Sequence, residues 1–286
     1  MPFRFEKSES PSKAVRRVCR ERVGAALDCL RQPKHPAAVH GARKEIKKLR
    51  ALFRLVRGEI SVGTYRKGVK ALRAAGDCLA ATRDARVMLK AFEKLTGRTA
   101  GRYADIEKAL EKHARKEARR FRRDDAVALA ERLLRKTHRR VEGLKIKRTG
   151  WAAIAPGLKR SYQQGRDASR LVRRKPAPEN FHEWRRHVKD LWFYFCLLHP
   201  ICQAATPAAA DELERLALYL GEDHDLFLLQ EFLRNQCKAR SQEVKALNAL
   251  IGARQKKLRS AAVKLGSRLY VETPAAFCQR LAEGRR

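Results

Sequence analysis

Apolar residues recur along most of this chain at the three- and four-residue spacing of amphipathic helices, and we find no convincing strand alternation. Between clusters of Gly and Pro, the periodicity predicts about eight helices, several of them long. Their approximate spans are residues 11–32, 36–58, 63–95, 101–141 with a break near Asp124, 151–173, 180–199, 208–236 and 239–270. The pattern therefore predicts an all-α protein.

An internal repeat divides these helices into two sets. Residues 39–56 align with residues 181–198, and both segments contain the pattern His-x-x-Arg-x-x-x-Lys. The aligned pairs are His40 with His182, Arg43 with Arg185 and Lys47 with Lys189. Residues 79–89 align in the same way with residues 220–230, which places Asp84 on Asp225. Because solvent-facing polar positions drift freely, the shared pattern predicts a duplicated four-helix unit, residues 1–146 and 147–286.

The charge of the chain indicates an anionic partner. There are 66 Lys and Arg residues against 31 Asp and Glu, a formal charge of +35. Self-repulsion on this scale opposes folding unless nucleic acid, an anionic membrane or another polyanion offsets it. The seven cysteines form no CxxC pair, the N-terminus has no signal-peptide core, and the longest apolar run, residues 191–198, cannot span a bilayer. We therefore expect a soluble, cytoplasmic protein with reduced thiols.

A cationic ridge is predicted on the helix over residues 36–58. At 100° per residue, the side chains His40, Arg43, Lys47, Arg50 and Arg54 fall within an arc of about 80° beside the apolar stripe. One acid lies among the seven Lys and Arg residues between positions 39 and 58. A merely solvated face would be expected to carry interleaved acids, so their scarcity indicates that the counter-charge is supplied by a ligand.

Basic residues also gather on later helices. Lys159, Arg166, Arg170 and Arg173 share an arc of roughly 60°, whereas the cations of residues 113–123 spread around their helix, as on a solvated surface. Asn180 and Glu183 form a capping-box-like pair, which predicts a helix start there. This start would put His182 in the first turn, where free N–H groups favour an anion.

Several of these segments resemble the CHAD family of histidine-bearing α-helical domains that bind inorganic polyphosphate. The segments are residues 39–55, 79–89, 158–168, 181–195 and 220–229, which are spread over both halves of the chain. The resemblance implies two four-helix bundles related by a pseudo-twofold axis, with long antiparallel helices around a basic central cavity or groove. The candidate polyphosphate-binding residues are His40, Arg43, Lys44, Lys47, Arg50, Arg54, Lys159, Arg166, Arg170, His182, Arg185, Arg186 and Lys189.

The second ridge is shorter than the first. Trp192 stands at the position aligned with Arg50, and Cys196 at the position aligned with Arg54. We therefore expect the first repeat to carry more of the binding. Affinity should rise with polyphosphate chain length until the groove is filled, because each added phosphate can meet another cation.

Nucleic-acid binding is the main alternative, since phosphate contacts dominate non-specific affinity for nucleic acids as well. Most aromatic residues, such as Phe53, Trp184 and Phe195, fall on apolar faces, which leaves little for base stacking. Membrane association is disfavoured, because the apolar stripes beside the basic faces are needed for the bundles.

A metal-dependent phosphohydrolase is the second alternative, suggested by the dipeptide His224–Asp225. The aligned dipeptide, Arg83–Asp84, cannot bind a metal through its first residue. We therefore favour a structural role, in which Asp84 and Asp225 orient neighbouring cations or cap backbone groups. The sequence predicts a binding protein without catalysis, without a cofactor and without a metal.

Overall fold

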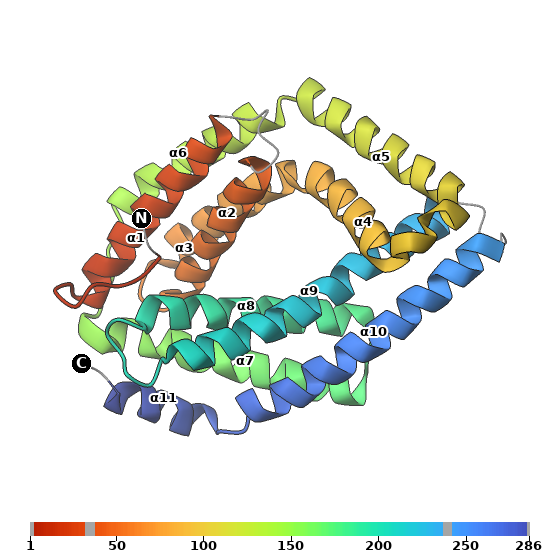
Figure 1. Ribbon diagram of the computed structural model, residues 1–286. Helices are drawn as coiled ribbons and strands as arrows, with labels where there is room; N and C mark the ends of the chain where they lie inside the picture. The colour runs from red at the N-terminus through yellow and green to blue at the C-terminus, as the bar shows by residue number, and fades with distance from the viewer. Residues whose placement is uncertain (1–2, 32–37, 237–241, 285–286) are drawn as a thin grey trace.

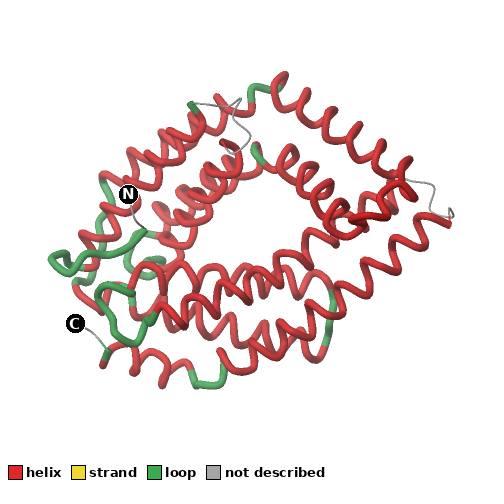
Figure 2. Tube along the Cα trace, viewed as in Figure 1, coloured by secondary structure: helices red, strands yellow, loops and turns green. Residues whose placement is uncertain are grey.

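The computed structural model describes residues 3–31, 38–236 and 242–284. These residues form α-helices and two short 3-10 helices, with no strand among them (Figures 1 and 2). The α-helices are α1 (Pro11–Leu30), α2 (Ala38–Leu55), α3 (Val62–Cys78), α4 (Ala80–Thr96), α5 (Ala104–Arg123), α6 (Ala126–Glu142), α7 (Ala155–Arg174), α8 (Pro178–Leu198), α9 (Pro207–Gln236), α10 (Gln242–Leu269) and α11 (Pro274–Glu283). The 3-10 helices are η1 (Gly97–Tyr103) and η2 (Gly150–Ala153). The predicted all-α fold is confirmed.

Two predicted helices are each divided in the structure. The span 63–95 consists of α3 and α4, which separate at Leu79, where φ of −94° and ψ of 2° depart from helical values. The span 101–141 separates into α5 and α6 at Asp125, whose φ of 43° is left-handed, beside the predicted break. Helix α11 was not predicted. The predicted break over residues 32–36 and the start of the span 239–270 lie outside the described residues.

The helices form two packed groups that share one large core. Helices α1, α2, α3 and α6 pack on one another, and α7, α8, α9 and α10 form the second group, with α11 against α7 (Figure 1). The largest cluster of buried apolar side chains runs through both groups, from Phe5 to Leu281. A second cluster joins α4 and α5 to the adjoining parts of α9 and α10 through Phe92, Leu110 and Phe232. The predicted boundary between residues 146 and 147 stays a prediction, as does the duplication.

Helix α5 lies at the edge of the molecule, where α4 is its main neighbour (Figure 1). It buries Ile106 and Leu110 and leaves most of its basic side chains exposed. The cations of residues 113–123 thus lie on an exposed helix at the edge of the molecule. Within the described ranges, none of the helices is long and apolar enough to cross a membrane.

Helix α2 is fixed closely against α7 and α8, which belong to the other group. A Cβ atom at Gly157 on α7 would lie 1.8 Å from the carbonyl oxygen of Leu55, so the two backbones touch there. On α8, the buried Tyr194 hydroxyl donates a hydrogen bond of 2.9 Å to the carbonyl oxygen of Ala51. These contacts set the position of α2 relative to α8, and the space between those two helices is the site described next.

Candidate anion-binding site

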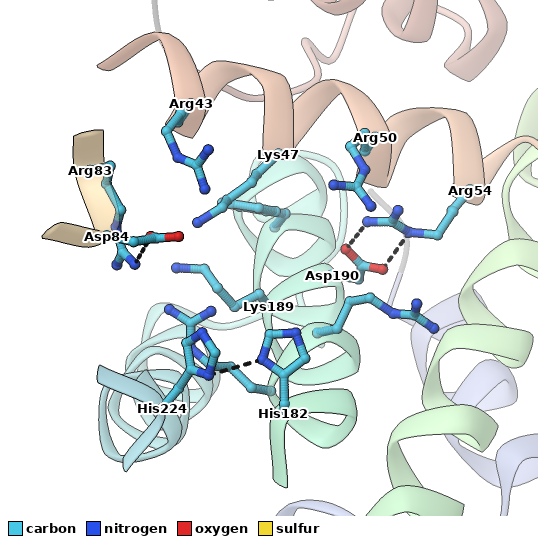
Figure 3. A pocket seen from close by; sticks show the side chains of 13 residues that line it. Arg43, Lys47, Arg50, Arg54, Arg83, Asp84, His182, Lys189, Asp190 and His224 are labelled. Atoms are coloured by element: carbon cyan, nitrogen blue, oxygen red, sulfur yellow. Dashed lines mark hydrogen bonds and ion pairs between the residues drawn. The ribbon is translucent and has the colours of Figure 1, made fainter. Parts of the chain in front are cut away.

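A cavity of about 290 Å³ lies between α2, α4, α8 and α9 (Figure 3). Its lining is almost entirely polar and comes from both halves of the chain. The lining residues are Arg43, Lys47, Arg50 and Arg54 from α2, Arg83 and Asp84 from α4, His182, Arg185, Arg186, Lys189, Asp190 and Phe193 from α8, and His224 from α9. The ridge predicted on α2 therefore faces the basic face of α8 with which its sequence aligns, across a shared space.

Positive charge dominates this cavity, which has eight Lys and Arg side chains against two Asp. Burial, together with the nearby charges of Arg185 and Arg83, lowers the pKa of Lys47 to about 7. Burial and the charge of Arg185 lower the pKa of Lys189 to about 8. Because like charges in a partly buried space disfavour protonation, the free cavity lacks counter-charge that an anion would supply.

Three arginines of the cavity have a buried Nε atom without a hydrogen-bond acceptor among the described residues. They are Arg43, Arg50 and Arg185. One terminal nitrogen of Arg43 is held by the carbonyl oxygen of Gly76, which fixes the side chain while its Nε stays free. Buried donors are normally paired, and leaving one unpaired is unfavourable by about 1–3 kcal/mol. The guanidinium groups of these three arginines are therefore not fully hydrogen-bonded within the described part of the chain.

The acids of the cavity each hold an arginine. Asp190 is 4% exposed and binds Arg54 through both oxygens, at 2.6 Å from Nε and 2.5 Å from Nη2. Although burial acts in the opposite direction, this ion pair raises the pKa of Arg54. On the other side, Arg83 bonds Asp84 at 2.9 Å and Asp225 at 3.4 Å. Asp84 and Asp225 therefore orient a cation, in agreement with the structural role predicted for them.

Two histidines meet at the edge of the cavity between α8 and α9. Nδ1 of His182 lies 3.2 Å from Nδ1 of His224, a hydrogen bond in which one ring donates and the other accepts (Figure 3). Burial, the charge of His182 and nearby arginines lower the pKa of His224 to about 3. Partial burial and the charge of Arg185 also lower the pKa of His182. Both shifts of the pKa favour the neutral form of the rings in the free protein.

The predicted helix start at Asn180 is wrong. Helix α8 begins at Pro178 after the N-cap residue Ala177, and the Asn180 side chain instead donates to the carbonyl oxygen of Lys175 at 2.8 Å. Proline is favoured in the first helical turn because it needs no N–H partner there, and this moves the start upstream. His182 consequently lies beyond the free N–H groups of the first turn, and its ring contacts His224 of α9 instead.

The structure brings together eight of the thirteen candidate residues. Arg43, Lys47, Arg50, Arg54, His182, Arg185, Arg186 and Lys189 line the cavity, whereas His40 and Lys44 are exposed outside its lining. These two lie close by, since burial and the charges of Arg83, Lys47 and Lys44 lower the pKa of His40.

The three candidates on α7 lie outside the cavity. Lys159 and Arg170 are exposed, and Arg166 donates to the carbonyl oxygen of Tyr270 at 3.2 Å. Their shared arc turns away from α2, because Leu158, Ser161 and Tyr162 bury the inward face of α7. Instead Arg160, one position after Lys159, reaches α2 and donates to the carbonyl oxygen of Arg54 at 2.9 Å.

Sequence reasoning missed three charged or ionisable residues that line the cavity, Arg83, Asp190 and His224. Arg83 and His224 are aligned by the repeat, and this alignment could have shown that the two face a common site. Among the described residues, no group of three or more His, Cys, Asp and Glu side chains is placed to hold a metal ion.

These observations define an all-α protein with a basic cavity enclosed by helices from both halves of the chain. The sequence model of the CHAD domain matches residues 14–234, and the chain belongs to the CHAD domain family. A comparison with curated proteins found no match.

Two solved structures share the fold. The CHAD domain from the plant Ricinus communis is 16% identical, with a TM-score of 0.67 over 94% of this chain and 96% of that chain. PptA from Streptomyces chartreusis is 14% identical, with a TM-score of 0.62 over 92% of this chain and 100% of that chain. At these identities the likeness concerns the fold alone.

Proposed function

We propose that this protein binds inorganic polyphosphate in the central cavity and does not cleave it. The observation that carries the proposal is a single cavity whose eight Lys and Arg side chains can donate hydrogen bonds, while its two Asp are already bound to arginine. Phosphate oxygens accept such hydrogen bonds, and arginine can present two parallel donors to them. Membership of the CHAD family supports the same ligand, in line with the resemblance found in the sequence.

Polyphosphate suits this cavity better than nucleic acid does. Its phosphates follow one another without sugars or bases, so a chain can place acceptor oxygens on closely spaced cations. Phe193 is the one Phe, Tyr or Trp in the described lining, and it lies beside Lys189 rather than forming a stacking surface. A single-stranded nucleic acid would gain phosphate contacts but little base stacking.

The hydrogen bonds and ion pairs of the acids and histidines near the cavity support binding without catalysis. Asp84 and Asp225 both bond Arg83, and His224 bonds His182. These contacts occupy the side chains that a hydrolytic site would need as bases or ligands. We further propose that the protein is cytoplasmic and associates with polyphosphate granules. The many cations of its site would keep it bound to such a polyanion.

The function is tested by titrating the protein with long-chain polyphosphate in calorimetry and mobility-shift assays. Arg43→Glu/Lys47→Glu reverses two cavity charges and should abolish measurable binding. The matched control is Lys112→Glu/Lys116→Glu on the exposed helix α5, which makes the same change in net charge outside the cavity. Equal losses in both variants would mean that net charge, and not the cavity, holds the ligand.

Two further measurements separate the alternatives. Single-stranded DNA should compete with polyphosphate only weakly at about 0.15 M salt, where exposed charges are screened. Incubation of the protein with polyphosphate and Mg²⁺ or Mn²⁺ should release no phosphate. Phosphate release that disappears in Asp225→Ala would overturn the proposal that the protein does not cleave its ligand.

A further inference from the structure

A second basic compartment, of about 180 Å³, opens between α2, α3, α7 and α8. We call it the α3–α7 compartment; the cations that belong to it and not to the central cavity are Arg57, Arg73 and Arg160. It shares four lining residues with the central cavity, which are Arg50, Arg54, Arg186 and Asp190. The two spaces are therefore neighbours along one continuous basic surface.

The α3–α7 compartment carries as little counter-charge as the central cavity. Its described lining has six arginines and one acid, Asp190, which is already bound to Arg54. Burial and the charge of Arg57 lower the pKa of Arg160, and burial with the charges of Arg54 and Arg73 lowers the pKa of Arg50. Cations thus repel one another across this compartment too.

The ion pair between Arg54 and Asp190 stands between the two spaces. Both residues line both of them, and both side chains are largely buried. Arg50 lies beside the pair, and its buried Nε has no acceptor among the described residues. A linear anion that leaves the central cavity on this side would pass Arg50, which lines both spaces, and then meet the cations of the α3–α7 compartment.

We propose that the α3–α7 compartment is a second phosphate subsite, which binds the continuation of a polyphosphate chain seated in the central cavity. This inference rests on the proposed function. A short condensed phosphate fills the central cavity alone, whereas a long chain also passes the Arg54–Asp190 pair and reaches Arg57 and Arg73. The compartment thereby discriminates long chains from short ones, and it gives a structural basis to the expected dependence on chain length.

The test compares triphosphate with long-chain polyphosphate in calorimetry of the full chain. Arg57→Gln/Arg73→Gln removes two exposed cations of the compartment and none from the central cavity. We expect the affinity for long chains to fall about 10-fold, with a change of no more than about twofold for triphosphate. The matched control is Lys67→Gln/Lys70→Gln, two exposed lysines of α3 that line neither space.

Three results would overturn the inference: unchanged affinity for long chains, an equal loss for triphosphate, or an equal loss in the control. Each of them leaves central-cavity binding by the wild-type protein intact. Failure of the proposed function looks different, since the wild type would then bind neither ligand, or Arg43→Glu/Lys47→Glu would bind as the wild type does. Circular dichroism checks that Arg57→Gln/Arg73→Gln and its control are folded, which is expected because their substituted side chains are exposed.

Discussion

The walls that α2 and α8 contribute to the cavity differ in how their charges are balanced. Helix α2 presents four Lys and Arg side chains and no acid, whereas α8 adds Asp190 among its cations. The charges that shift the pKa of Lys47 are all cations, whereas the charge of Glu214 partly offsets the cations around Lys189, its aligned partner. Two aligned basic faces can therefore differ in how far nearby acids offset their cations, even when their leading residues match.

The residues that interrupt the second ridge lie outside the central cavity. Trp192 packs beneath Lys189, with Nζ 4.8 Å from the ring centroid, and so supports a cation of the cavity. Cys196 is also absent from the described lining. The basic face of α8 therefore extends further in the cavity than its sequence indicates, and its one acid, Asp190, binds Arg54 of α2 and not a cation of α8. That the first repeat carries more of the binding stays a prediction.

The largest expected effect comes from neutralising matched pairs on the two walls. Arg43→Gln/Lys47→Gln on α2 should weaken polyphosphate binding about 100-fold, since two charge-assisted contacts are lost. Arg185→Gln/Lys189→Gln on α8 should weaken it about 10-fold, because acids already offset part of that charge. Calorimetry at one salt concentration gives both values. A greater loss from the α8 pair would reverse the comparison.

The second expected effect is a change of polyphosphate affinity with pH. Lys47 and Lys189 have pKa values of about 7 and about 8 in the free protein, and a bound phosphate would raise both. The complex then holds more protons than the free protein, so affinity should rise about 10-fold or more from about pH 9 to about pH 6.

Arginine at either position stays protonated throughout this range. Lys47→Arg should therefore remove the part of the pH dependence centred near pH 7, and Lys189→Arg the part near pH 8. Proton uptake, measured by calorimetry in buffers of different ionisation enthalpy, should fall correspondingly. The same uptake in both variants as in the wild type would exclude these two lysines as its source.

The smallest effect is on the stability of the free protein. The pKa of Lys47 lies below its ordinary value of 10.5, so the folded chain binds fewer protons than the unfolded chain between these values. Stability from this group is therefore lost as pH falls from about 10 toward 7. Lys47→Met should raise the melting temperature near neutral pH, by about 2–4 °C for each kcal/mol gained.

Lys189→Met should raise the melting temperature less, because the pKa of Lys189 is lowered less and its amine rests on Trp192. Differential scanning calorimetry without ligand compares the two variants. A melting temperature that falls in Lys47→Met would show that its amine stabilises the empty cavity, contrary to the pKa shift.

Much of the fold could be predicted because helical periodicity survives in a single sequence. The division at Leu79 could not, since the nearest glycine, Gly76, lies inside α3 and Leu79 itself is a good helix former. The break at Asp125 lies beside the one predicted near Asp124, because two successive aspartates interrupt the helical pattern there. The start of α8 was misplaced, since a competent capping residue, Asn180, lay inside a helix that proline had already begun.

Periodicity predicted which side chains share a helix face, but not which neighbour that face meets. This was sufficient on α2, where the predicted ridge from Arg43 to Arg54 lines the cavity. It failed on α7, where Arg160 and not Lys159 points toward α2. The pairing of Arg54 with Asp190 joins residues far apart in the chain, and no local pattern encodes it.

The position of α2 at the site depends on its contact with Gly157, a residue with no side chain beyond a hydrogen atom. Any β-carbon there would strike the peptide oxygen of Leu55, immediately after Arg54. A single methyl group would act as a wedge, tilting α2 away from α7 and altering the spacing of every cation along it. The spacing of the cations along α2 therefore depends on the absence of a side chain at position 157, a residue that itself carries no charge.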